Sequence, residues 1–356
     1  MRSPNLLLLL FLLLPIVGCS DTLAPSDDDD PSTETDGIFY VKYSESTQLG
    51  SLWLADDEQA EVEVMQGIQA FVAHGHAVVV GEDTSEVSID TVRIVTTHGT
   101  GRITTRAEFL LQQSPYGLDR PGVSPTGDAI AVPHGVSFNG VNGWVNYELW
   151  LYGPDGTVKM PKNIAREAMP AFSPDGSEVA YFTRDGELLV ANINGSTVRT
   201  VTTVPMVVND YFTGLTWSAD GSRLAFTAAT DETSFDFHLY VVPSAAGGSK
   251  VDLGPGFFPS FSPDGSKIAY SEEGGRISLL DAATIESGNP EQIGTLNVND
   301  AFCASPQWSP DGKRLLCIAL AEGPGDGNLG SLVIFDVESG THTLFSQNVF
   351  SATWAR

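Results

Sequence analysis

Four aspartates stand at matching positions along the chain and are the first candidates for chemistry. They are Asp175, Asp220, Asp264 and Asp311. Carboxylates act as acids, bases and cation ligands. Each of these, however, has a Ser two residues before it and a Gly directly after it, the composition of a β-turn in which Asp bonds its own backbone. We therefore expect a structural role, with a cation held near a central channel as the alternative.

A second candidate is the pair His74 and His76. On a strand, residues two apart put both imidazoles on one face, where they could ligate a metal. The pair flanks Gly75 at a predicted hairpin turn, and no third ligand can be identified. We expect a polar turn, no bound metal and no other cofactor.

Cys303 and Cys317 precede and follow one of the repeated turns, on strands predicted to be neighbours. In an oxidising compartment they could form a disulfide between these strands. Two small buried side chains are the alternative, because Cys packs well without bonding. The sequence leaves both interpretations open.

The motifs of several enzyme classes are missing from the sequence. It contains no Gly-x-Ser-x-Gly elbow with a downstream Asp and His, no Walker loop and no His-Glu-x-x-His. We therefore predict that the protein is not an enzyme.

The candidate residues are positioned by a repeat of 44 to 49 residues. Its serines are Ser124, Ser173, Ser218, Ser262 and Ser309. In most units a short strand ends in an aromatic residue such as Trp217 or Phe261, Ser-Pro-Asp-Gly turns the chain, and an alternating strand follows. The period suits a four-stranded propeller blade. The pattern resembles the TolB-like propeller repeat, a relative of the WD repeat, over residues 37–356. This resemblance implies an all-β chain folded as a single β-propeller.

The two ends of this region complement each other. Residues 350–354 match the strand before the turn, and no second strand follows them. Residues 37–43, 50–55 and 61–65 read as a second, third and fourth strand. We therefore predict one composite blade closed by both termini. With a divergent blade over residues 69–106 and five clear repeats, the count is seven, and six is the alternative.

The N-terminus has the pattern of an export signal. Residues 1–18 hold a short basic start and an apolar run too short to cross a bilayer core of ~30 Å. The run ends in Ile16-Val17-Gly18-Cys19, which resembles the bacterial lipobox. That resemblance implies cleavage before Cys19, lipidation of its thiol and, because Ser20 follows, anchoring at the outer membrane rather than the inner one. Residues 19–36 read as an acidic, disordered tether, and residues 37–356 as the propeller.

The net charge of -27 rests on 45 Asp+Glu against 18 Lys+Arg. Nucleic-acid binding needs basic residues against the phosphates, so we exclude it. Attachment to anionic lipid headgroups is excluded for the same reason, which leaves membrane contact to the lipid anchor alone. An acidic surface favours solubility and, secondarily, cationic partners or divalent ions.

The longest loops are expected on one face of the propeller, where the second and third strands of a blade are joined and where one blade leads to the next. These loops are residues 134–148, 228–237 and 319–330, with the links 207–212 and 299–302. The residues we expect to bind a partner there are Phe138, Trp144, Tyr147, Asp210, Tyr211, Phe212, Phe235, Phe237 and Asp300. Alternatively, these rings cap the core beneath their own loops.

Two functions follow from this arrangement. The first is a non-catalytic scaffold that binds an envelope protein, peptide or glycan. The second is a polysaccharide lyase or hydrolase, which would need a base and a cationic group in the central funnel. Arg120 and Arg166 are the main basic residues near that face. The scarcity of such residues favours the scaffold.

Overall fold

The structure is a computed structural model of the chain. It describes residues 37–44, 49–55, 61–68, 70–74, 77–82, 91–98, 102–110, 121–138, 144–165, 169–205, 214–233, 236–287, 290–298, 301–321 and 329–355. These residues form antiparallel strands and one short 3-10 helix, Ile285–Ser287. The predicted all-β class is confirmed.

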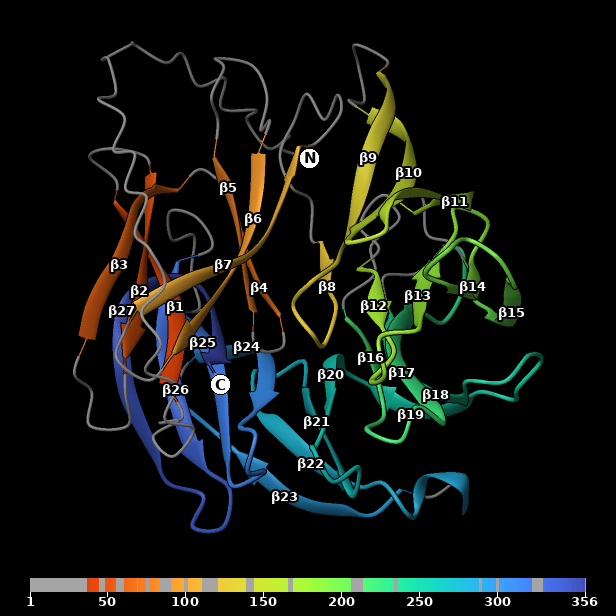
Figure 1. Cartoon of the computed structure of the whole chain (residues 1–356). Helices are drawn as coiled ribbons and strands as arrows, with labels where there is room; N and C mark the ends of the chain where they lie inside the picture. The colour runs from red at the N-terminus through yellow and green to blue at the C-terminus, as the bar shows by residue number, and fades with distance from the viewer. Residues whose placement is uncertain are drawn as a thin grey trace. The chain divides into compact units, whose positions relative to one another are not determined.

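Most of the described strands belong to sheets of four, the blades of a β-propeller (Figure 1). One blade holds β4 (Ala70–His74), β5 (Ala77–Glu82), β6 (Thr91–His98) and β7 (Arg102–Leu110). The next holds β8 (Gly122–Val123), β9 (Ile130–Phe138), β10 (Trp144–Gly153) and β11 (Gly156–Ile164). A third holds β12 (Ala171–Phe172), β13 (Glu178–Phe182), β14 (Glu187–Asn192) and β15 (Arg199–Thr203). Two more hold β16 (Leu215–Trp217), β17 (Arg223–Ala229), β18 (Phe237–Pro243) and β19 (Val251–Pro255), then β20 (Phe257–Phe261), β21 (Lys267–Ser271), β22 (Ile277–Asp281) and β23 (Gln292–Leu296).

The remaining sheet contains seven strands in the order β24-β25-β26-β27-β1-β2-β3. They are β24 (Ala301–Trp308), β25 (Arg314–Ala321), β26 (Gly330–Asp336), β27 (His342–Ala355), β1 (Gly37–Ser44), β2 (Leu49–Ala55) and β3 (Glu61–Ile68). The first half of β27 pairs with β26, and its second half pairs with β1, from Gly37 opposite Ala355 to Lys42 opposite Val349. In Figure 1 the red β1 and the dark blue β27 mark this junction. The predicted pairing of the two ends is therefore present. Counting this sheet as two blades that share β27 gives seven, and that count stays a prediction.

The repeated turn is closed by its own side chains. In the turn after β20, the Ser262 hydroxyl donates to Asp264 Oδ1 over 2.5 Å and accepts the Lys267 N–H over 2.9 Å, while Asp264 also accepts the Ser266 N–H over 3.0 Å. Gly265 follows with a φ of 70°, a region that glycine enters without steric cost. These bonds hold the pKa of Asp264 at about 2, with the Ser262 hydroxyl as the largest cause. The predicted bond between the turn's Asp and its own backbone is confirmed.

Three tryptophans tie their strands to the preceding blade. The indole N–H of Trp217 donates to the Ala171 carbonyl over 3.0 Å, and that of Trp308 to the Ser260 carbonyl over 3.0 Å. Trp354 does the same at the junction, donating to the Gln307 carbonyl over 3.1 Å. A buried indole needs a partner for its N–H, and here the neighbouring blade supplies it.

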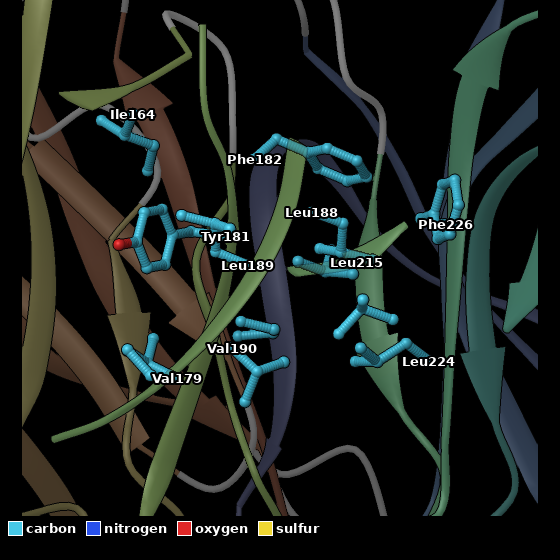
Figure 2. Close-up of a cluster of buried hydrophobic side chains, with 14 of the residues drawn as sticks. Ile164, Val179, Tyr181, Phe182, Leu188, Leu189, Val190, Leu215, Leu224 and Phe226 are labelled. Atoms are coloured by element: carbon cyan, nitrogen blue, oxygen red, sulfur yellow. The ribbon is translucent and has the colours of Figure 1, made fainter. Parts of the chain in front are cut away.

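Between blades lies an apolar core to which the inner strands contribute side chains from both of their faces. Figure 2 shows the part built by Val179, Tyr181 and Leu189 of one blade and Leu215, Leu224 and Phe226 of the next. The Phe182 and Phe226 rings meet edge to face, with centroids 5.2 Å apart. Such packing fixes neighbouring blades against each other, so loops carried by two blades are held in a defined relation.

Cys303 and Cys317 are both buried and carry free thiols. Burial, followed by the neighbouring Cys303, raises the pKa of the Cys317 thiol well above its usual range. Both side chains are small and buried here, and a disulfide between them in an oxidising compartment stays a prediction.

No helix among the described residues is long and apolar enough to cross a membrane. Cys19, the signal and the tether lie outside the described residues, so lipidation and the domain boundaries at 18 and 36 stay predictions.

Candidate binding face

Hairpins that join successive strands of a blade turn at alternate ends of the sheet. The Ser-Pro-Asp-Gly turns therefore lie at one end, and the turns between second and third strands lie at the other, together with the links between blades. We call this second end the long-loop face. Two contacts place turns and links together there: the Gly256 N–H, in the link before β20, donates to the Phe237 carbonyl over 3.3 Å, and the Cys303 N–H at the start of β24 donates to the Gly275 carbonyl over 3.0 Å.

Four half-buried phenylalanines form an aromatic cluster on this face: Phe237, Phe257, Phe258 and Phe302. Phe257 is its centre. The centroid of its ring lies 6.1 Å from that of Phe237 in the preceding blade, 6.5 Å from that of Phe258 and 6.5 Å from that of Phe302 in the following blade. These separations and the tilted or edge-on ring planes suit aromatic pairs. The cluster thus joins three consecutive blades.

The backbone beneath the cluster adopts an uncommon conformation. Phe258 has a φ of 54°, in the left-handed region that bulky residues seldom adopt. It stands three residues before Phe261, and the residues three before Trp217 and Trp308 are also left-handed, Gly214 at 91° and Ser305 at 52°. Near Phe258 and Ser305 the pairing with the second strand shifts register. These bulges redirect the starts of β20 and β24, and at Phe258 a large side chain bears the strain.

Carboxylates surround the cluster, and we call them the acidic rim: Asp231, Glu232 and Asp236 before β18, with Glu272 and Glu273 between β21 and β22. Asp236 directly precedes Phe237, and its side chain is 61% exposed. Glu272 receives the guanidinium of Arg276 over 2.8 Å. Arg276 is the only basic residue in the described parts of these two turns, so the rim keeps a net negative charge.

His238 connects the rim to the outer strand of the same blade. Its Nδ1 lies 2.8 Å from Asp252 Oδ1, and its Nε2 lies 3.7 Å from Asp236 Oδ1. The imidazole therefore stands between two carboxylates, bonded to Asp252 and farther from Asp236. Within the described residues, no group of three or more His, Cys, Asp or Glu side chains is placed to hold a metal ion.

One expected loop is shorter than the sequence suggested. Residues 134–148 were expected as a loop, but β9 continues to Phe138 and β10 begins at Trp144. The pairing of β9 with β10 continues through these residues, with His134 opposite Glu148. The His134 side chain points into the interior, where its Nε2 lies 3.0 Å from the Tyr152 hydroxyl. Burial lowers the pKa of His134 to about 4, against a smaller opposite effect of Glu148.

The expected partner-binding residues separate into four groups. Phe237 lies in the aromatic cluster. Tyr147 is 6% exposed and packs in the core. This agrees with the alternative that the ring caps the core beneath its own loop, so we leave Tyr147 out of the binding surface. Phe138 and Trp144 end β9 and begin β10, where their backbones pair. The others lie outside the described residues: Asp210, Tyr211, Phe212, Phe235 and Asp300, as do Arg120, Arg166 and His76, whereas His74 ends β4.

Sequence reasoning missed Phe257 and Phe258, although a signal was present. The link before β20 reads Gly-Phe-Phe-Pro, which puts two bulky rings next to a glycine at the entrance to a first strand. Binding residues were predicted only in the longest loops, and this link is short.

No protein-family model matches the chain, and no curated protein matches it. Solved structures do. The chain is similar to an oligogalacturonate lyase from Vibrio parahaemolyticus, with 12% identity and a TM-score of 0.53 over 79% of this chain and 87% of that one. It is also similar to a Bacteroides fragilis protein provisionally assigned as a 6-phosphogluconolactonase, with 12% identity and a TM-score of 0.57 over 93% of this chain and 100% of that one. These two likenesses support the β-propeller fold and leave the activity open.

TolB from Acinetobacter baumannii also matches, at 15% identity and a TM-score of 0.49. The match covers 90% of this chain and 66% of that TolB, slightly under two thirds of its length.

Proposed function

We propose that this protein is a non-catalytic β-propeller scaffold of the bacterial envelope, held to a membrane by a lipid on Cys19, that binds a partner through the long-loop face. One observation carries the binding role: the aromatic cluster, in which Phe257 joins rings from three blades on the face that also carries the exposed rim carboxylates. Aromatic residues that are rigidly supported and still partly exposed are typical anchors of binding surfaces.

The anchor and the location rest on the sequence of residues 1–36, with its apolar run, its lipobox-like end and its acidic tether. Ser20 after Cys19 favours the outer membrane. The Ser-Pro-Asp-Gly repeat, which recurs in phase, supports placing the chain among TolB-like propellers. A protein, peptide or glycan of the envelope is the partner class that this location offers.

The alternative, a propeller-type lyase or hydrolase, needs a base beside a cationic group. Beside the aromatic cluster, Arg276 is bound to Glu272, and the remaining rim groups are carboxylates. An anionic glycan would be repelled by them. We therefore prefer binding to catalysis.

Affinity capture tests the proposal. The full chain, solubilised in detergent, is used as bait on envelope extract and compared with the double variant Phe237→Ala/Phe302→Ala. The control is Leu344→Ala, which removes an apolar side chain that is 52% exposed on the outer part of β27. We expect one partner to be retained by the wild type and the control, and reduced about tenfold or more by the double variant.

Equal capture by all three proteins would refute the long-loop face as the binding surface. Depolymerisation of an envelope polysaccharide by the purified chain would replace the scaffold with the enzyme.

A further inference from the structure

The aromatic cluster and the acidic rim together specify the chemistry of an occupant. We propose that the long-loop face binds a cationic polypeptide segment, whose Lys or Arg side chains lay their apolar stems on the phenylalanine rings and reach the rim carboxylates with their charged ends. This inference rests on the proposed binding function and names the partner class that suits it.

The two turns beside the aromatic cluster are negatively charged. The described residues of the two turns that flank the cluster carry the five rim carboxylates and one guanidinium, and that guanidinium is already paired with Glu272. Glu232 and Glu273 are exposed, and among the described residues neither side chain has a hydrogen-bond or ion-pair partner. Unpaired exposed carboxylates attract cations and repel anions.

The rim carboxylates lie directly beside the rings of the aromatic cluster. Asp236 is bonded to Phe237 through the backbone, and the turn of Glu272 and Glu273 packs its Gly275 against Phe302, with the Cys303 N–H bonded to the Gly275 carbonyl. Lys and Arg are the side chains that combine an apolar stem with a terminal cation. A neutral sugar would use the rings alone, and an anionic one would be repelled by the rim.

Elsewhere in this chain, lysine side chains already stack on aromatic rings. Lys42 Nζ lies 4.5 Å from the Trp53 ring centroid, and Lys250 Nζ lies 4.9 Å from that of Tyr240. Each of these cations also has a polar partner, Glu61 for Lys42 and the Thr203 carbonyl for Lys250. A ring beside an oxygen acceptor is thus a cation site in this fold, and the cluster offers the same pairing to solvent.

A short synthetic peptide of alternating lysine and glycine is the probe, titrated calorimetrically into the full chain in neutral detergent. Its matched control peptide has glutamate in place of lysine. We expect saturable binding of the lysine peptide with one site per chain, weakened about tenfold between about 0.05 M and about 0.5 M NaCl. The glutamate peptide should not bind.

Variants separate this face from diffuse attraction by an acidic protein. Glu232→Lys/Glu273→Lys reverses two rim charges, and Asp155→Lys/Glu338→Lys makes the same change in net charge at exposed turns on the opposite face. We expect the rim variant to lose about tenfold in affinity, the opposite-face variant to lose less than about twofold, and Phe302→Ala to lose about fivefold.

Equal weakening by the two charge-reversal variants would overturn the inference, as would absence of binding. Competition by a neutral oligosaccharide with no salt dependence would overturn it in favour of a glycan. The proposed function fails separately: it falls if Phe237→Ala/Phe302→Ala leaves envelope capture unchanged. If capture needs those rings but survives both high salt and the rim reversal, the scaffold stands and the cationic partner does not.

Discussion

At the scale of single residues, His134 links burial to pH. Its side chain is only 4% exposed and is bonded to the Tyr152 hydroxyl. Burial lowers its pKa from 6.5 to about 4. As the pH falls below 6.5, the unfolded chain takes up a proton at this residue, while the native chain does not until about pH 4. The free energy of unfolding is therefore highest above pH 6.5 and falls by up to about 3 kcal/mol as the pH drops to about 4.

We expect His134→Gln to flatten this part of the pH profile, because the replacement does not titrate. At neutral pH it should cost about 1–3 kcal/mol from the disturbed buried bond. The free energy of unfolding, measured in urea from pH 7 to pH 4, checks both effects. His342→Gln changes an exposed histidine and should keep the wild-type slope. An unchanged slope in His134→Gln would show that other groups set the pH dependence.

The residue scale is also where prediction from sequence succeeded least. Phe237 was found because it ends a long loop, whereas Phe257 was missed because its link is short. Tyr147 was assigned to a surface loop, yet the alternation of β10 turns it into the core. A residue predicted in a loop is buried when the strand in fact extends past it. Sequence patterns locate strand ends poorly, and here β9 and β10 extend well into the predicted loop 134–148.

At the scale of elements, the turn between β21 and β22 supports the start of β24. Gly275 has a φ of 82°, and a Cβ added there would lie 2.7 Å from the Ala301 carbonyl oxygen and 2.8 Å from the Phe302 Cα. Glycine is required here both by the backbone conformation and by the close approach of the next blade.

We expect Gly275→Ala to lower the free energy of unfolding by about 2–4 kcal/mol, from left-handed strain and from displacement of β24. Gly274→Ala is the matched control, since a Cβ there meets nothing within 4 Å and its φ is not positive. It should change stability by less than about 0.5 kcal/mol. Chemical denaturation gives the free energy of unfolding of both variants. Equal values would mean that the turn and β24 move apart without cost to make room for a Cβ at residue 275.

Elements were the scale at which sequence reasoning worked best. The five repeat serines predicted the phase of their blades, and the composition of Ser-Pro-Asp-Gly predicted the turns, because such a turn is closed by bonds between residues two to five apart. The bulges at Phe258 and Ser305 could not be foreseen. They arise where a first strand must bend between two neighbouring blades, which is a tertiary requirement.

At the scale of the whole molecule, the junction of β27 with β1 holds the two ends of the propeller together. Trp354 is 2% exposed there, lies beneath the Arg314 guanidinium at 4.8 Å from its ring centroid, and donates to the Gln307 carbonyl. It therefore joins β27 to β24 as well as packing against β1.

We expect Trp354→Ala to cost about 3–5 kcal/mol and to lower the unfolding midpoint of the entire propeller in one transition. Phe350→Ala, on the same strand but 48% exposed, should stay close to the wild type. Deletion of residues 350–356 removes the pairing altogether and should be more damaging still. If the deleted protein melted like the intact one, the two ends would not form a structural unit in solution.

The junction of β27 with β1 also delays completion of this sheet during synthesis. Gly37 pairs with Ala355, so β1 to β3 leave the ribosome long before the strand that completes their sheet. Until then, the β1 edge is an unpaired template for other chains. Contacts this distant in sequence also form slowly. We therefore expect a chain whose translation stops before β27 to aggregate more readily than the full chain, which a sedimentation assay of the truncated product would check.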